Sequence, residues 1–225
     1  SGKKAEAKTP DEAGKDGTEA KTDEAVSEIK NVIPAPLANT KPVSEPEKPE
    51  EFVPARGTVE NGIYKNSAFG VSFSAEEDWY FLSDSEIAQT MGIAAEEMFG
   101  EGTEVEPGNI YDMYCVDMET NATVSVNYEN VAGTENITNE GAYLEIVTSQ
   151  IVSAGASSGV KDAFIGDVEI GGVKTTCLNI ELEVSGVKIY EKIVAKQIGD
   201  WMCSITVASL SETEMEDLIG RISFE

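Results

Sequence analysis

The sequence predicts an α+β fold, an antiparallel β-sheet with helices packed on its faces, preceded by a disordered tail. Three observations support this prediction. Four β-rich runs near the C-terminus are separated by short turns that contain glycine, helical segments separate the other β-rich runs, and seven of the eight prolines fall in the first 56 residues. We therefore expect two parts: a disordered tether at residues 1–56 and a single acidic α+β domain at residues 57–225.

The tether is expected to be disordered because of its composition. Pro, Ala, Thr, Glu and Lys predominate, Phe52 is its one aromatic residue, and nine Lys and Arg stand against twelve Asp and Glu. Such a segment has too little apolar surface to offset the entropy of ordering. Proline fixes φ and restricts the residue before it, so stretches such as 42–49 favour extended conformers. We expect a semi-stiff spacer whose removal leaves the fold intact.

The first half of the domain is expected to contain two strand pairs and two helices. The strands are expected at 63–66, 69–74, 110–119 and 123–131. A helix begins after Ser83, because Ser83-x-x-Glu86 forms a capping box that satisfies unpaired backbone N–H groups. A second helix is expected from about residue 139 to residue 154, where apolar residues share one face and Gly155 is a stop signal.

The second half is expected to form a four-stranded antiparallel meander followed by a helix. The strands are expected at about 163–170, 173–184, 187–198 and 201–209. Two-residue turns that contain glycine join them, and such turns fix the register of a hairpin. The final helix begins at the capping box Ser211-x-x-Glu214. Its apolar stripe is expected to include Met215, Leu218, Ile219 and Ile222.

The start of the domain resembles a known family. Tyr64-x-Asn66, followed by Phe69-Gly70-Val71-Ser72-Phe73 and by Trp79, is similar to the opening of Mog1/PsbP-like domains. The resemblance covers roughly residues 58–225 and implies an antiparallel sheet between helices. The family includes a photosystem subunit, a Ran-binding protein and many bacterial lipoproteins of undefined role. It implies binding as the common theme, and no ligand-contacting motif can be transferred to this chain.

The N-terminal residues indicate where the chain is located. Ser1-Gly2-Lys3-Lys4, leading into the polar tether, resembles the start of a mature bacterial lipoprotein just past its lipid-bearing cysteine. An ordinary linker has the same composition, and this alternative stays open. No run of 18 or more apolar residues is present to span a membrane. We therefore expect a lipid-anchored location on the extracellular face of a bacterial membrane, with the membrane contacted through the anchor alone.

The acidic charge limits the possible partners. The formal net charge is −26, and residues 57–225 hold thirty acidic residues against seven basic ones. Binding of phosphates requires clustered Lys and Arg, which argues against a nucleic-acid partner. The acidity either keeps an exported protein soluble or attracts a cationic partner or Ca²⁺. The acidic clusters lack the spacing of a calcium-binding loop, so we expect no metal site.

The reactive side chains indicate a protein that is not an enzyme and has no cofactor. The sequence contains no histidine, which excludes Ser-His-Asp catalysis, His-ligated zinc and a histidine proton shuttle. Two Ser-x-x-Lys matches, at Ser158 and Ser185, lie in a loop and in a hairpin turn, whereas such a nucleophile needs the start of a helix. Paired Asp or Glu residues remain as the one route to hydrolysis.

Three residues are candidates for a ligand-binding site: Trp79, Tyr80 and Glu191. Trp79 and Tyr80 belong to the densest aromatic group of the chain, which serves either core packing or a ligand platform. Strand alternation places Glu191 on the face of Leu178, Ile180 and Leu182, where an unpaired charge is costly. A β-bulge, an edge position or a buried functional carboxylate would each account for Glu191.

The three cysteines are expected to be unpaired thiols. An odd count leaves at least one thiol free in a monomer, and Cys115, Cys177 and Cys203 each lie within an apolar strand pattern. The expected register places Cys177 opposite Val194 and Cys203 opposite Lys196. A whole strand then separates the two cysteines, which is too far for a disulfide.

The sequence thus predicts a monomeric, non-catalytic extracellular binding or assembly module, displayed from a membrane anchor on a flexible tether. Its partner would be a protein or a cell-envelope ligand. The alternative is a carboxylate-dependent hydrolase of a cell-surface or extracellular substrate.

Overall fold

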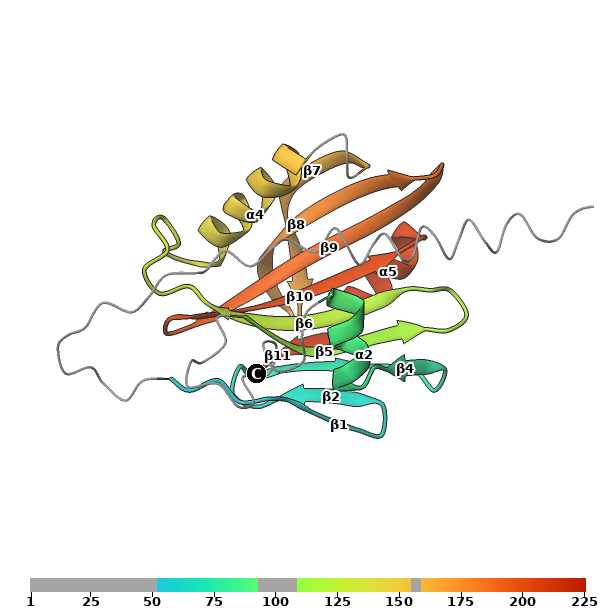
Figure 1. Ribbon diagram of the computed structural model, residues 1–225, viewed down its shortest axis with the longest axis horizontal. Helices are drawn as coiled ribbons and strands as arrows, with labels where there is room; N and C mark the ends of the chain where they lie inside the picture. The colour runs from blue at the N-terminus through green and yellow to red at the C-terminus, as the bar shows by residue number, and fades with distance from the viewer. Residues whose placement is uncertain (1–51, 93–108, 155–158) are drawn as a thin grey trace, which may run out of the picture.

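The computed structural model describes residues 52–92, 109–154 and 159–225. Residues 1–51 of the predicted tether lie outside the described residues. The described part is α+β, as predicted, with two antiparallel sheets and helices on the larger sheet (Figure 1).

The larger sheet has seven strands and contains the predicted meander. Its strands, in spatial order, are β4 (Trp79–Phe81), β5 (Asn109–Asp117), β6 (Thr123–Asn130), β10 (Trp201–Ser209), β9 (Val187–Ile198), β8 (Val173–Val184) and β7 (Val160–Ile170). Ser185 and Gly186 both have positive φ, 51° and 81°, as a two-residue hairpin turn requires. This turn fixes the register of β8 and β9, and Cys177 lies opposite Val194 as predicted.

A second sheet of four short strands was not expected from the sequence. It consists of β1 (Thr58–Glu60), β2 (Ile63–Asn66), β3 (Val71–Ser74) and β11 (Ile222–Phe224). The prediction that Ile222 belongs to the last helix was wrong. That helix ends at Ile219 with Gly220 as its C-cap, and Ile222 pairs with Phe73 in β11. Three residues are too few to show a strand period, which is why β11 was missed.

Three helices are described, α2 (Asp84–Met91), α4 (Glu140–Ala154) and α5 (Glu212–Ile219). At α2, the Glu86 carboxylate accepts from the Ser83 backbone N at 2.8 Å. At α5, Ser211 Oγ accepts from the Glu214 backbone N at 3.3 Å. The two predicted capping boxes therefore mark the correct helix starts.

The helices and the small sheet divide between the two faces of the large sheet. The small sheet and α5 pack on one face, around Tyr128, Ile205 and Val207. On the other face, α4 packs over β7, β8 and β9, and α2 packs over β5 (Figure 1). The Phe69 and Tyr128 rings join the two sheets, with centroids 4.9 Å apart.

All three cysteines are buried, unpaired thiols, as predicted. Cys203 lies opposite Lys196 on β9, so that β9 separates it from Cys177 on β8. Burial raises the pKa of the Cys115 and Cys203 thiols above the ordinary value. They therefore act as small apolar core residues.

Among the described residues, no helix has the length and apolar character to cross a membrane.

Candidate functional site

Glu191 is buried at the centre of the large sheet. It lies opposite Ile180 of β8 and Ala208 of β10, in an uninterrupted register between two full neighbours. It therefore occupies neither a β-bulge nor an edge position. Its side chain faces the apolar side that the sequence predicted, and only 1% of the residue is exposed.

The Glu191 carboxyl has no hydrogen-bond partner on either oxygen. Burial raises its pKa to about 8, because the ionised form loses the solvation of water. Tyr114 of β5 lies within electrostatic reach, and its pKa is raised to about 12 by burial, with Glu191 contributing. Glu191 is thus a neutral acid at neutral pH, and its role in ligand binding stays a prediction.

A strip of small polar side chains runs beside Glu191 along β6 and β10. We call it the polar strip; it consists of Thr123, Ser125, Asn127, Ser204 and Thr206. Its members are buried; Ser125 lies opposite Thr206 and Asn127 opposite Ser204, while Thr123 lies opposite Ala208. Ser204 Oγ donates to Asn127 Oδ1 at 2.8 Å. This pairing shows how the strip can satisfy its polar groups internally, as buried polar groups require.

Glu129 stands at the far end of β6 from Glu191. Tyr143 of α4 donates to Glu129 Oε1 at 2.7 Å, and burial, followed by the charge of Glu129, raises the pKa of Tyr143. Glu191 is in register with Thr123 through Ala208, and Glu129 lies six residues beyond Thr123 on β6. At about 3.4 Å per residue, the two carboxyls are about 20 Å apart along the strands.

The third buried carboxyl, Asp112, lies on the opposite face of the sheet. The register of β5 and β6 shifts between Tyr111 and Met113, so Asp112 is the extra residue of a β-bulge. The bulge changes the phase of strand alternation and turns Asp112 toward the small sheet. Its side chain is fully buried.

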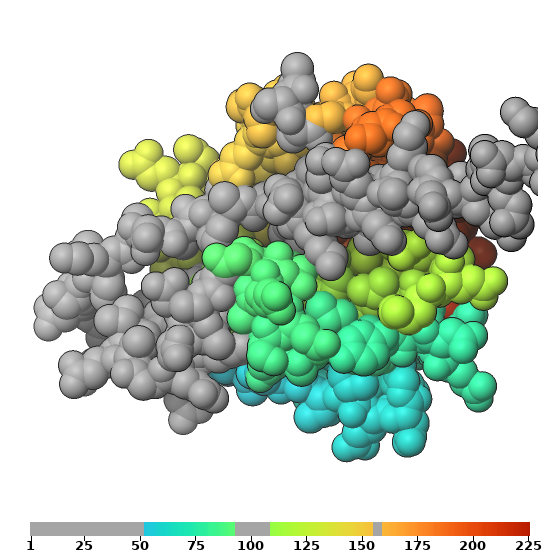
Figure 2. All heavy atoms as spheres, turned by 45° about the vertical axis from the view of Figure 1, so that its right-hand side comes forward, coloured from blue at the N-terminus to red at the C-terminus, as the bar shows by residue number. Residues whose placement is uncertain are grey.

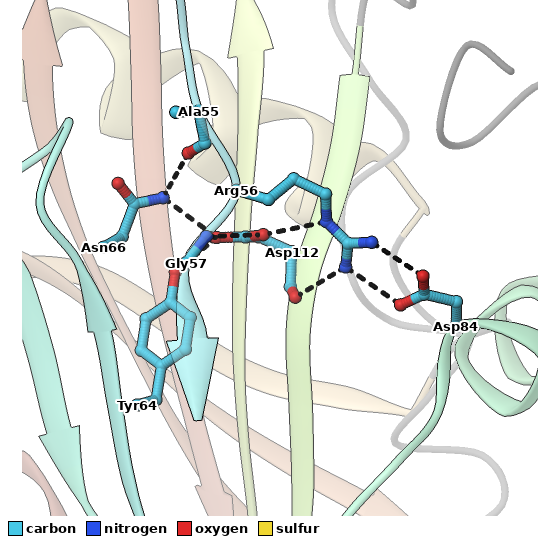
Figure 3. Close-up of polar contacts among 7 residues, drawn as sticks. All are labelled: Ala55, Arg56, Gly57, Tyr64, Asn66, Asp84 and Asp112. Carbon is cyan, nitrogen blue, oxygen red and sulfur yellow. Dashed lines mark hydrogen bonds and ion pairs between the residues drawn. The ribbon is translucent and has the colours of Figure 1, made fainter. Parts of the chain in front are cut away.

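Donors from two separate segments, residues 56–57 and strand β2, surround the Asp112 carboxylate (Figure 3). Tyr64 donates from its hydroxyl at 2.6 Å, Asn66 Nδ2 at 2.9 Å and the Gly57 backbone N at 2.8 Å. Arg56 Nε donates at 3.1 Å, and the Arg56 guanidinium also binds both oxygens of Asp84 at the start of α2. We call these residues the Asp112 clamp. Each of the two carboxylate oxygens accepts at least two hydrogen bonds, which suits a structural role.

The last residues of the predicted tether contact the domain. The predicted tether ended at Arg56, but Arg56 belongs to the clamp and the Ala55 carbonyl accepts from Asn66 Nδ2 at 2.9 Å. The Phe52 ring packs edge-on against Phe69, with centroids 5.1 Å apart. Phe52, Ala55 and Arg56 thus contact the domain, and the boundary between tether and domain at residue 56 stays a prediction.

The two aromatic candidates occupy different environments. Trp79 lies in the core, 9% exposed, with its ring 5.6 Å from that of Phe73. Tyr80 is 47% exposed, and its hydroxyl donates to Glu86 at 2.9 Å, next to α2, which stands out at the surface in green (Figure 2). Tyr80 and Glu191 are not brought together, since Tyr80 belongs to an edge strand and Glu191 to a central one. Ligand binding by either aromatic stays a prediction.

A shallow hollow of about 390 Å³ lies on the surface of the described residues. It is lined by the start of α4, by β8 and β9, and by Phe224. Its two lysines are already engaged: Lys174 pairs with Asp167 at 2.8 Å, and Lys196 donates to the carbonyls of Gly70 and Glu225. Within residues 52–92, 109–154 and 159–225, no three acidic or cysteine side chains converge on a candidate metal site.

Two exposed apolar side chains of the large sheet lie on its edge strand β7. Phe164 is 54% exposed and Ile165 is 39% exposed, on opposite faces of the same strand. Further along β7, Val168 packs on the core and Ile170 is buried in it. Among the described residues, no strand pairs with the outer side of β7, so the first half of β7 is an open edge of this part of the chain, at the upper border of the sheet in Figure 1. Sequence reasoning placed this strand but did not identify it as an edge.

No family model matches the sequence, and no curated protein matches it. Solved structures that resemble the fold include a protein of Bacteroides thetaiotaomicron, at 11% identity over 77% of this chain, with a TM-score of 0.36. This chain spans 49% of that protein's length.

Two further structures also resemble the fold. LpqN of Mycobacterium tuberculosis, described as involved in cell envelope biogenesis, has 10% identity over 68% of this chain and 82% of its own, with a TM-score of 0.34. PA94, a protein of unknown function from Pseudomonas aeruginosa, has 11% identity over 45% of this chain and 67% of its own, with a TM-score of 0.28. None of the three confirms the Mog1/PsbP-like resemblance.

Proposed function

We propose that this chain is a non-catalytic binding or assembly module, displayed on the extracellular face of a bacterial membrane by an N-terminal tether and a lipid anchor. The observation that carries the proposal is the open edge of the large sheet in the first half of β7, with Phe164 and Ile165 exposed on its two faces.

Natural proteins usually protect the edges of their sheets. An edge strand presents unpaired N–H and C=O groups, and it is normally short, bulged, covered or rich in lysine. β7 has 11 residues, and its first half combines exposed backbone with two large apolar side chains. The one irregularity of its pairing lies at Lys161, the first residue of the exposed stretch 161–165. These features favour a surface that is covered by a partner.

The placement of the buried acids argues against the hydrolase alternative. Glycoside hydrolysis needs two carboxyls about 5–10 Å apart across a cleft. Glu129 and Glu191 are about 20 Å apart by strand geometry, and Asp112 lies on the other face of the sheet. Among the buried acids of the described residues, none faces another across such a distance.

The Asp112 clamp supports display on a tether. The tether joins the domain at Phe52–Gly57. There Arg56 and Gly57 are held by the Asp112 carboxylate of the large sheet, which also binds Tyr64 and Asn66 of the small sheet, and Arg56 in turn binds the start of α2. A pull on the tether is therefore distributed over several elements instead of acting on one short edge strand.

Site-specific photo-crosslinking tests this function. Benzoylphenylalanine replaces Phe164, which is 54% exposed, in one variant and Met118 of the β5–β6 turn, which is 68% exposed, in another. In native cells, we expect a discrete adduct from position 164 and none from position 118. Identical patterns at the two positions, or the absence of any adduct, would contradict a binding module that uses this edge.

A further inference from the structure

We propose that the first half of β7 accepts a basic, extended segment of a partner protein as an eighth strand of the large sheet. This inference rests on the proposed binding function and names the chemistry of the partner. The partner segment would carry apolar side chains alternating with Lys or Arg.

The backbone of β7 is available on one side only. Residues of β7 pair with β8 from Val160 to Ile170, and β7 is the last strand in the order of the sheet. The backbone groups that point away from β8 therefore form a template for strand addition, in which main-chain hydrogen bonds supply affinity and side-chain contacts supply specificity. The exposed stretch, 161–165, has the length that a short peptide strand would cover.

The side chains of β7 offer an apolar contact on each face. Phe164 shares its face with Gly166, where the Asn179 side chain of β8 fills the space that a Cβ would take, so Phe164 is the apolar contact on this face. Ile165 lies on the face of α4, as does Ala163. Val152 near the end of α4 is 56% exposed. A partner strand with an apolar residue on each face could cover Phe164 and Ile165 together.

The charges of β7 select a basic partner. Asp162, Asp167 and Glu169 are exposed along the strand, with Asp167 already paired with Lys174 of β8, against the single basic residue Lys161 of β7. Lys161 already lies 3.7 Å from Glu183. The whole chain carries a formal charge of −26, so its field favours the approach of a cationic segment and repels an acidic one.

A second copy of this chain does not fit the same edge. Antiparallel self-pairing centred between Phe164 and Ile165 would place Asp162 of each copy opposite Asp167 of the other. Like charges directly opposite each other destabilise a strand pair, and the net charges of the two copies add to the repulsion. The occupant is therefore a different, cationic chain.

The probe is a fluorescein-labelled peptide of about seven residues in which Lys alternates with Val. Its binding to the full chain is measured by fluorescence anisotropy. One control peptide carries Glu in place of each Lys, and a second keeps the lysines but has proline at its centre, which removes a backbone donor. We expect the Lys peptide to bind and both control peptides to bind at least about tenfold more weakly.

Variants of the chain locate the contact. Phe164→Ser should weaken binding of the Lys peptide about tenfold, since it removes the aromatic anchor. Asp162→Lys should weaken it by a similar factor and reduce its salt dependence. Met118→Ser, which removes an exposed apolar side chain in the β5–β6 turn, is the matched control and should leave binding unchanged.

The outcomes separate this inference from the proposed function. Equal binding of the Lys and Glu peptides, or equal binding by Phe164→Ser and the parent chain, would overturn the inference of a basic strand on β7. An adduct from position 164 in cells together with no binding of the Lys peptide would overturn the partner chemistry while the binding function stands. Self-association that Phe164→Ser abolishes would assign the edge to a second copy and would also overturn the inference.

Discussion

Substitution of Glu191 by Gln is expected to stabilise the domain strongly at neutral pH. Burial without a partner raises the pKa of Glu191 from its ordinary value of 4.5 to about 8. The folded state must therefore hold a proton that the unfolded chain releases above about pH 4.5. Gln keeps the shape of the neutral side chain and cannot ionise in either state, so it removes this cost.

The magnitude follows from the difference between the two pKa values. Each pKa unit corresponds to about 1.4 kcal/mol. At pH 7 the cost of Glu191 is about 3 kcal/mol, and above pH 8 it levels off near about 5 kcal/mol. Because the pKa of the Glu191 carboxyl is raised in the folded state, the stability of the domain is greatest below about pH 4.5 and declines as the pH rises toward about 8. The substitution should therefore be nearly neutral at about pH 4.5 and stabilising at pH 7.

Urea denaturation of the parent chain and of Glu191→Gln at several pH values between about 4.5 and 8.5 measures this difference. Other titrating groups cancel when the two free energies of unfolding are subtracted. Glu169→Gln, an exposed glutamate of β7, is the matched control and should change the free energy by less than about 0.5 kcal/mol at every pH. A difference for Glu191→Gln that does not grow with pH, or that shrinks, would refute the reasoning.

Three further predictions concern the Asp112 clamp, the start of the domain and the thiols. Asp112→Ala should lower the free energy of unfolding by about 3–5 kcal/mol, because it leaves buried donors without their acceptor. Urea denaturation measures this loss, and a loss below about 1 kcal/mol would contradict the structural role of the Asp112 clamp. A chain that begins at Gly57 should melt several degrees below one that begins at Phe52, since it lacks the contacts of Phe52 and Arg56. Equal melting temperatures in calorimetry would support the predicted boundary between tether and domain at residue 56. In thiol titration without a reductant, all three cysteines should be unreactive in the folded chain and reactive after denaturation; a single reactive thiol would indicate a disulfide.

The meander could be predicted from sequence because short turns fix register. The turns Ser185-Gly186 and Gly199-Asp200 each allow a single register for the strands that they join. Counting residues outward from these turns therefore predicted the partners of Cys177 and Cys203 and the face on which Glu191 lies. The same counting could not decide between a bulge, an edge and a buried acid for Glu191. That choice depends on which strands flank β9, a property of the whole sheet.

The Asp112 clamp could not be predicted from sequence. Asp112 is an extra residue in a strand, and nothing in the local pattern marks the bulge that turns it toward the small sheet. Its donors lie 46 to 56 residues away in the chain. Arg56 also follows a proline-rich segment of high charge, so composition assigned it to the tether. Long-range hydrogen bonds of this kind leave no periodic signal.

Amide hydrogen exchange of β7 in the full chain, with and without the Lys–Val peptide, tests the central claim most directly. We expect the amides of 161–165 that point away from β8 to exchange rapidly in the free chain and to become protected when the peptide binds, while the amides of the central strands β9 and β10 do not change. Unchanged exchange in β7, or peptide-induced protection confined to α2 and α4, would contradict binding at this edge.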